Sequence, residues 1–192
     1  MPDFSDWMPY VAFTTGAPPS PFYLRTVELA AGPGTAVDLG CGAGNEVLDL
    51  LQRGWQVHAV DSSEAALTEV ARRTDGLSGL TLEQSELWEA RPPAADYVHA
   101  GFSLFFAPPE RFTEVWAVVT RAVRPGGIFA GQLLGERDSW AGQPELTVHT
   151  EAEVRELLAG WSVLELESVE LDGKAMSGPK HWHRFDIVAR CF

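Results

Sequence analysis

A short apolar strand that runs into a glycine-rich turn constrains the fold of this chain more than any other feature. Ala36–Leu39 leads directly into Gly40, Gly42 and Gly44, and a helix is expected from Asn45 to about Arg53. Glycine lets the backbone turn tightly and approach a ligand where any Cβ would collide. The N-terminus of the following helix favours a negatively charged group. The pattern therefore predicts a strand, a ligand-binding turn and a helix in direct succession.

A second strand ends on an acid. Val57–Val60 is followed by Asp61, and a carboxylate at the tip of this strand can accept hydrogen bonds from both hydroxyls of a ribose. The turn and the acid together predict a nucleoside-binding half-site. The alternative is a glycine-rich turn in an α/β domain that binds no ligand.

The spacing of the glycines separates two cofactor classes. Dinucleotide sites read G-x-G-x-x-G and place the third glycine inside the helix. Here the order is Asp38-x-Gly40-x-Gly42-x-Gly44, with an acid two residues before the first glycine. A carboxylate at position 38 would repel a pyrophosphate, whereas it suits a ligand that carries an ammonium or sulfonium group. An NAD-type oxidoreductase is therefore the weaker of the two interpretations.

In Val37–Gly44 the chain resembles the first motif of the class I S-adenosylmethionine (SAM)-dependent methyltransferases. The resemblance implies that the three glycines line the methionine moiety and that Asp61 holds the ribose. It also implies that adenine lies beside Ser85–Leu87, where either Ser85 or Glu86 could reach it; Glu86 could equally be a solvated loop acid. The expected cofactor-binding residues are Asp38, Gly40, Cys41, Gly42, Gly44, Asp61, Ser62, Ser85, Glu86, Leu87 and Phe102, the last of which could also be a core aromatic.

Alternating strand and helix patterns continue along the chain. Strands are expected at Ala36–Leu39, Val57–Val60, Leu80–Glu83, Asp96–Gly101 and Ile128–Leu134, with helices at 21–31, 45–53, from Ser62 or Ser63 to about 75, from Pro108 to a stop at 125–127, and after the capping box Thr150-x-x-Glu153. Val163–Leu171 and His181–Cys191 close the chain without a helix between them, so they are predicted to be antiparallel. The fold class is thus α/β, a Rossmann-like doubly wound sheet, mostly parallel, with an antiparallel C-terminal hairpin.

One domain is expected over residues 1–192, with residues 1–20 as an N-terminal flap or lid. This flap contains Phe4, Trp7, Tyr10 and Phe13 without a clear period. It either packs on the core or, as the resemblance implies, covers the cofactor.

The charge balance argues against polyanionic partners. Lys and Arg number 14 against 27 Asp and Glu, a net charge of −13, whereas nucleic-acid binders need a basic surface. Nucleic-acid amino-methyltransferases also carry Asp/Asn-Pro-Pro-aromatic after the fourth strand, and here Pro108 and Pro109 come too late. Nucleic acids and anionic membranes are therefore not expected to be partners, and the expected substrate is a small molecule.

Compartment and metal content follow from equally simple features. The N-terminus lacks the basic and apolar regions of a signal peptide, and no apolar run reaches about 18 residues. Cys41 and Cys191 form neither a disulfide framework nor a metal-ligand spacing, which favours a cytoplasmic protein without a metal.

The segment Lys180–His183 is unusual for the start of a strand. His181 and His183 share the face of Phe185, so they are interpreted as partly buried, hydrogen-bonded histidines, with acceptor binding or proton transfer as the second reading and metal binding as the third. His58 and His99, inside strands, are interpreted as core residues. The acceptor site is predicted from the N-terminal flap, Glu136–Trp140 and His181–His183.

The pattern resembles bacterial small-molecule methyltransferases near the tellurite-resistance and thiopurine groups. The expected function is methyl transfer from SAM to a small-molecule acceptor. A general base is required only if the acceptor carries a proton at neutral pH. The alternatives are a nucleotide-dependent oxidoreductase and a non-catalytic SAM-binding regulatory protein. The sequence leaves the acceptor and the oligomeric state open.

Overall fold

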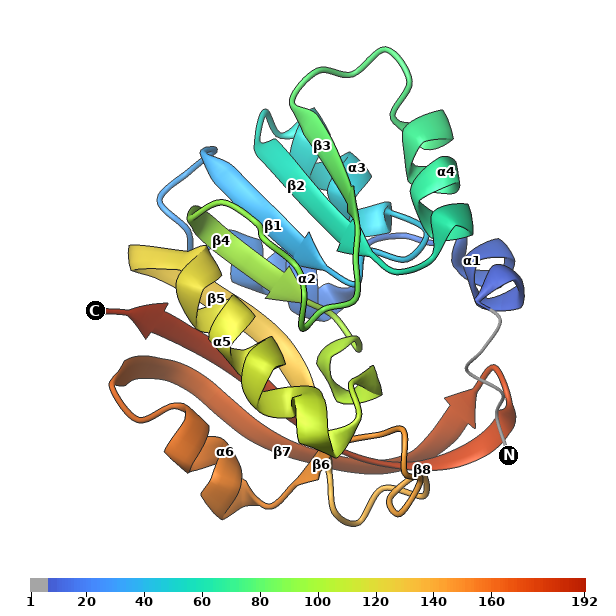
Figure 1. Cartoon of the computed structure of the whole chain (residues 1–192), viewed down its shortest axis with the longest axis vertical. Helices are drawn as coiled ribbons and strands as arrows, with labels where there is room; N and C mark the ends of the chain where they lie inside the picture. Colours follow the sequence, from blue (N-terminus) through green and yellow to red (C-terminus); the bar gives the residue numbers. More distant parts are fainter. Residues whose placement is uncertain (1–6) are drawn as a thin grey trace.

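The computed structural model describes residues 7–192, which form a mixed sheet with helices on both faces (Figure 1). The strands are β1 (Thr35–Leu39), β2 (Gln56–Asp61), β3 (Leu80–Gln84), β4 (Ala95–Ala100), β5 (Val123–Gly135), β6 (Val148–His149), β7 (Trp161–Ala175) and β8 (Gly178–Cys191). The helices are α1 (Met8–Thr14), α2 (Pro21–Val27), α3 (Asn45–Gln52), α4 (Glu64–Arg73), α5 (Phe112–Ala122) and α6 (Glu151–Leu157), with 3-10 turns at Leu104–Phe106 and Pro109–Arg111.

The order of the strands confirms the expected fold class. Neighbouring strands follow the order β3-β2-β1-β4-β5-β8-β7. The first five strands of the chain pair in parallel, and β8 runs antiparallel to both β5 and β7. The direction of winding reverses between β1 and β4, and ligands of such sheets bind at the carboxyl ends of the strands beside this reversal.

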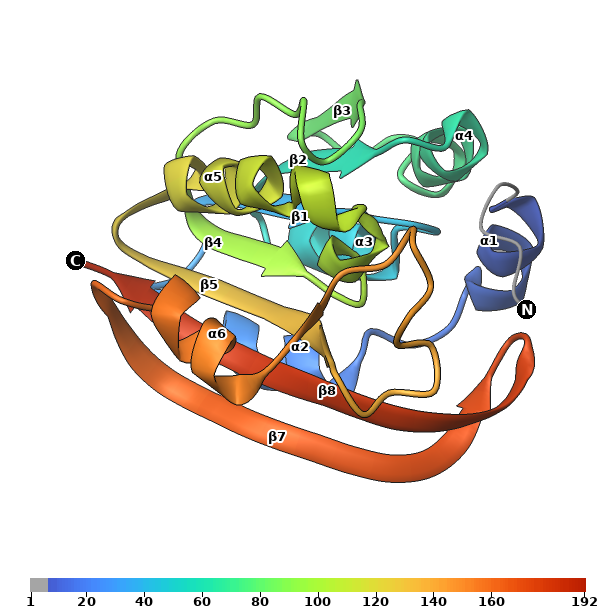
Figure 2. The ribbon, with the colours of Figure 1, turned by 60° about the horizontal axis from the view of Figure 1, so that its bottom comes forward.

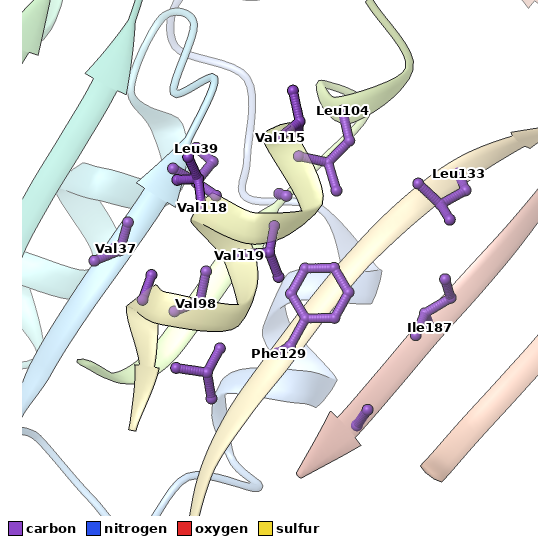
Figure 3. Close-up of a cluster of buried hydrophobic side chains, with 14 of the residues drawn as sticks. Val37, Leu39, Val98, Leu104, Val115, Val118, Val119, Phe129, Leu133 and Ile187 are labelled. Carbon is purple, nitrogen blue, oxygen red and sulfur yellow. The ribbon is translucent and has the colours of Figure 1, made fainter. Parts of the chain in front are cut away.

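Two buried clusters hold the helices against the sheet. On one face, α5 and α6 pack on side chains of β1, β4, β5 and β8, and Figure 3 shows Val115, Val118 and Val119 of α5 over Val37, Val98 and Phe129. On the other face, α2, α3 and α4 cover the alternate side chains of the same strands. Because successive strand residues point to opposite faces, each strand serves both clusters.

The C-terminal hairpin is longer than the sequence predicted. β7 and β8 pair from Trp161 opposite Cys191 to Ala175 opposite Gly178, so most of the expected loop 172–180 is strand. Figure 2 shows the hairpin curving around the molecule, with its tip on the side where α1 lies. The hairpin therefore brings Lys180 and His181 to the carboxyl edge of the parallel strands.

Several boundaries differ from the expectation. The N-terminal flap contains the helix α1, which the aperiodic aromatic pattern concealed, while Phe4 lies outside the described residues. α2 ends at Val27, and α5 begins at Phe112 after a 3-10 turn. The capping box of Thr150 and Glu153 is present as expected.

The length of β5 also departs from the prediction, while α3 buries Val47, Leu50 and Leu51 against the sheet. β5 begins at Val123, because that residue already pairs with Ala95 before the turn at 125–127. The short strand β6, which pairs with the end of β5, was not predicted.

Candidate functional site

The glycine turn after β1 is held from below by β2. Gly40 and Cys41 donate backbone hydrogen bonds of 2.8 and 3.0 Å to the Val60 carbonyl. All three glycines have positive φ, +79° at Gly40, +51° at Gly42 and +72° at Gly44, a region that costs an L-residue about 1–2 kcal/mol. The turn is therefore fixed by its backbone.

The three glycines are required for different reasons. A Cβ on Gly40 would overlap Ser103, and one on Gly44 would stand 2.6 Å from Val70 Cγ2, so internal packing accounts for both. A Cβ on Gly42 would meet only the Tyr10 ring, 3.9 Å away. Gly42 is thus the glycine at which the backbone is open to a ligand.

Asp61, at the end of β2, connects the glycine turn to the start of α4. Its Oδ2 accepts from the Gly42 N–H and its Oδ1 from the Ser63 N–H, both at 2.9 Å. Burial raises the pKa of Asp61, although these two hydrogen bonds oppose the shift. Ser63, rather than Ser62, caps α4 through Ala66. The carboxylate is consequently fixed beside the turn, with lone pairs left for further donors.

Residues after β3 extend this edge. The Ser85 N–H donates to the Asp61 carbonyl at 3.1 Å, and the Ser85 hydroxyl donates to the Glu86 carbonyl at 3.0 Å. Glu86 is exposed, and its pKa is raised by partial burial and by the charges of Glu89 and Asp61. Leu87 packs against the core cluster under α5. Ser85 and Glu86 therefore lie beside Asp61, whereas the Leu87 side chain contributes to packing.

Asp38 points into the sheet face covered by α2. Its Oδ1 accepts a hydrogen bond from His99 Nδ1 on β4 at 2.9 Å, and both side chains are buried. The sequence had suggested an acid open to a cationic ligand and a core histidine. The structure joins the two residues as a pair, because parallel β1 and β4 place Asp38 opposite His99.

The helix α1 lies over the glycine turn. Thr14 accepts through its carbonyl from the Asn45 side chain at 2.9 Å, and Val11 packs against Ala43 and Ala66. The Tyr10 ring reaches over Gly42, where burial and the charges of Glu46 and Asp61 raise its pKa. α1 thus covers the turn from the side of α4 (Figure 1).

The Phe102 ring packs against side chains of β8. It has a φ of +53°, unusual for a residue with a side chain, and its N–H donates to Gln132 Oε1 at 3.1 Å. The ring packs edge-on against Trp182 at 5.6 Å and lies under the Arg184 guanidinium. Phe102 consequently belongs to an aromatic group at the ends of β4, β5 and β8.

A buried ion pair anchors two tryptophans of this group. Lys180 Nζ pairs with Asp138 and lies 3.8 Å from the ring centre of Trp140 and 4.3 Å from that of Trp182. Asp138 also accepts from the backbone N–H groups of Trp140 (2.9 Å) and His183 (3.0 Å). Burial lowers the pKa of Lys180, while Asp138 opposes the shift. Sequence reasoning named this region but not the pair.

The two strand-entry histidines have different surroundings. His183 is buried and accepts a hydrogen bond through Nδ1 from the Arg137 N–H at 3.0 Å. His181 is half-exposed and pairs with Asp172 at 2.7 Å and Glu170 at 3.1 Å, which raise its pKa. Both are hydrogen-bonded. Among residues 7–192, no group of His, Cys, Asp and Glu side chains could hold a metal ion.

Two further observations concern the rest of the molecule. A surface hollow of about 310 Å³ is lined by Trp88, Arg91, Glu114, Ala117 and Arg121 and shares no residue with the predicted site. In the described part of the chain, no helix has the length and apolar character needed to cross a membrane.

Comparisons with known proteins agree with this geometry. Residues 37–129 match a family model described as a methyltransferase domain. Trans-aconitate 2-methyltransferase from Methylobacterium nodulans is 33% identical over 118 residues, which make up 60% of this chain and 43% of that protein. The chain spans between 38% and 57% of the length of the curated relatives it matches.

Solved structures share the fold over nearly the whole chain. TehB from Haemophilus influenzae superposes with a TM-score of 0.80 at 17% identity, covering 97% of this chain and 68% of that chain. The 1,6-didemethyltoxoflavin-N1-methyltransferase of Burkholderia thailandensis superposes with a TM-score of 0.71 at 22% identity, covering 94% and 80%. Residues 37–129, which include the glycine turn, match the methyltransferase domain family, and the Rossmann-like fold of the whole chain is shared with solved methyltransferases.

Proposed function

We propose that this protein is a SAM-dependent methyltransferase that acts on a small-molecule acceptor in the cytoplasm. The observation that carries the proposal is the fixed position of Asp61, whose two carboxylate oxygens hold the Gly42 and Ser63 N–H groups at 2.9 Å. This arrangement presents an acid and an open backbone turn to the same ligand, as a nucleoside requires.

The residues at this edge fit SAM. Asp61 would hold the ribose, Gly42 would lie against the amino-acid end, and Ser85 and Glu86 would lie beside adenine. Glu46, Asp61 and Glu86 make the surroundings acidic, which suits a cationic ligand better than a pyrophosphate. When bound, SAM supplies a methyl group on a cationic sulfur.

The aromatic group beside this edge suits the acceptor. Trp140 and Trp182 are fixed by Lys180, and Phe102 packs on Trp182. Partly apolar walls with a few polar groups are typical of small-molecule sites. The relatives support the same class, since trans-aconitate 2-methyltransferase and the didemethyltoxoflavin methyltransferase are named for small-molecule acceptors.

The chain's own contribution to transfer is positioning. α1 would act as a lid that excludes water, and the aromatic walls would orient the acceptor. Proximity and orientation of this kind are worth several kcal/mol. His181 and His183 are both engaged in hydrogen bonds, so they remain weak candidates for proton transfer.

The first test is cofactor binding. Calorimetry and thermal shift with SAM, S-adenosylhomocysteine, NAD and NADP distinguish the methyltransferase from the oxidoreductase alternative. A ligand at 100 times its dissociation constant stabilises the fold by about 2.7 kcal/mol, and we expect this shift with the two adenosyl ligands. Absence of any signal with them at millimolar concentration would overturn the proposal.

The second test is turnover. An acceptor panel that includes carboxylic acids and heteroaromatic compounds, read out through release of S-adenosylhomocysteine, should identify at least one substrate. Binding of SAM without turnover across the panel would favour the non-catalytic regulatory protein instead.

A further inference from the structure

His99 stands at the centre of the β1–β4 junction, below the carboxyl edge of the sheet. The side chain is 4% exposed, and Nδ1 donates to Asp38 Oδ1 at 2.9 Å. The ring packs edge-on against Tyr23 of α2 at 5.5 Å and stacks over Tyr97 of its own strand at 6.3 Å. These contacts leave the ring a single orientation.

The other ring nitrogen has no hydrogen-bond partner in the part of the chain that the structure describes. His99 Nε2 is buried and unpaired, and a buried donor without an acceptor costs about 1–3 kcal/mol. The ring leans over Gly101, the first residue after β4: a Cβ there would stand 2.7 Å from His99 Cε1 and 3.1 Å from Nε2. Nε2 therefore lies at the end of β4 that faces the ligand edge.

The electrostatic surroundings raise the pKa of the His99 ring. Burial by itself would lower the pKa of His99, but the charge and hydrogen bond of Asp38, with a smaller contribution from Glu46, raise it. A protonated imidazole donates through both nitrogens. One donor is used by Asp38, so the second calls for an acceptor, and a carboxylate forms the strongest hydrogen bond with a cationic donor.

We propose that His99, oriented by Asp38, binds the carboxylate of the cofactor's amino-acid end through Nε2. The inference rests on the proposed function and adds a cofactor-binding residue that sequence reasoning had assigned to the core. It also gives Asp38 a role, because the acid fixes the ring and balances its charge. The cationic groups of the cofactor would lie nearer to the acids Glu46 and Asp61, and its carboxylate would lie nearer to His99.

The test compares two ligands that differ in one group, SAM and decarboxylated SAM, by calorimetry on the full chain. His99→Asn keeps an amide nitrogen near the position of Nδ1, and so the bond to Asp38, but removes Nε2. We expect this variant to bind SAM roughly ten- to a hundredfold more weakly. Its affinity for decarboxylated SAM should stay within about threefold of the parent.

His58→Asn is the matched control, because His58 is also a strand histidine paired with an acid, Glu83 at 2.7 Å, on neighbouring strands. It should leave the preference for SAM unchanged. His99→Gln, whose amide reaches the position of Nε2, should recover part of the preference. Equal weakening of both ligands by His99→Asn, or no weakening of either, overturns the inference while the proposed function stands.

Failure of the parent protein to bind either ligand overturns both proposals. Should His99→Asn not fold, nitrogen NMR of the parent decides. The His99 Nε2 resonance should shift with SAM and stay in place with decarboxylated SAM, and identical spectra with the two ligands would contradict a carboxylate contact.

Discussion

The two sides of the candidate site are built by different means. On the side proposed for the cofactor, the backbone turn of Gly40–Gly44 and the acid Asp61 come from adjacent βα units. Backbone N–H groups of the turn donate to the Val60 carbonyl and to the Asp61 carboxylate. On the side proposed for the acceptor, rings from the segment after β4, from β8 and from the loop after β5 gather around the buried pair of Lys180 and Asp138. The shape of the first side is therefore set by the backbone conformation, and the shape of the second side is set by the packing of side chains.

Two buried histidines show the same contrast. His99 and His149 each have a ring nitrogen without a partner among the described residues. Asp38 raises the pKa of His99, whereas burial lowers the pKa of His149 to about 4, with only the charge of Glu153 in opposition. A carboxylate in direct contact thus offsets the fall in pKa that burial causes in a histidine.

Among these variants, removal of the Asp138 side chain should have the largest effect on stability. Asp138→Ala leaves the buried ammonium of Lys180 unpaired, which should lower the free energy of unfolding by about 3–5 kcal/mol, measured in urea. Adding Lys180→Met should recover much of the loss. Asp172→Ala, at an exposed acid, should cost less than about 1 kcal/mol. A loss of similar size in both single variants would mean that the pair does not anchor this side.

The charge states of the two histidines can be separated by pH. His149 is neutral when folded, and its unfolded form has a pKa near 6.5, so the unfolded state binds more protons between about pH 6.5 and 4. Stability should therefore fall by about 3 kcal/mol as pH decreases through this window. Urea unfolding of the parent and of His149→Phe checks this: the variant should have the shallower pH dependence, and parallel curves would show that His149 is not the group responsible.

The cofactor side should respond most in affinity. Asp61→Ala removes a charged acceptor whose hydrogen bonds are worth roughly 1.5–3 kcal/mol each, so S-adenosylhomocysteine should bind at least about tenfold more weakly with the fold intact. Calorimetry and circular dichroism measure the two properties. Affinity equal to that of the parent would mean that the nucleoside lies elsewhere.

Trp140→Ala should separate the two sides. The ring covers Lys180 at 3.8 Å and takes no part in the glycine turn. Cofactor affinity should stay within about twofold of the parent, while kcat/KM for an identified acceptor falls by about tenfold or more, close to 1.4 kcal/mol. Deletion of Met1–Phe13, which removes all of α1 except Thr14, should have the same direction of effect. Parental rates in both variants would make the loop and the helix purely structural.

Gly42→Ala combines a small expected effect on stability with a direct test of the glycine turn. Gly42→Ala introduces a side chain at a φ of +51°, where its Cβ would be 3.9 Å from the Tyr10 ring. It should cost about 1 kcal/mol of stability, yet it should weaken SAM binding measurably. Gly44→Ala, which would meet Val70, should cost more stability. If Gly42→Ala leaves affinity unchanged, the backbone does not approach the ligand there.

The sequence by itself determined the parallel sheet, the antiparallel ending and the glycine turn followed by Asp61. These features depend on short-range rules: strand and helix periodicity, the positive φ that glycine allows, and the capping residues Ser63 and Thr150. Such rules act within a few residues, so they can be read before the chain is folded. Element ends were less certain, as α1 and the extended hairpin show.

The tertiary structure decided which side chains meet. Asp38 and His99 are 61 residues apart, and the register of β1 and β4 brings them together. Asp138 and Lys180 are 42 residues apart and meet where β8 extends past the end of its neighbour β5. An acid in one strand and a histidine in a later strand was the available signal, and it has meaning only when the register is known. Because a shift of one residue turns a side chain to the opposite face, the pairing of Asp38 with His99, the raised pKa of His99 and the positions of the aromatic rings follow from the assembled sheet.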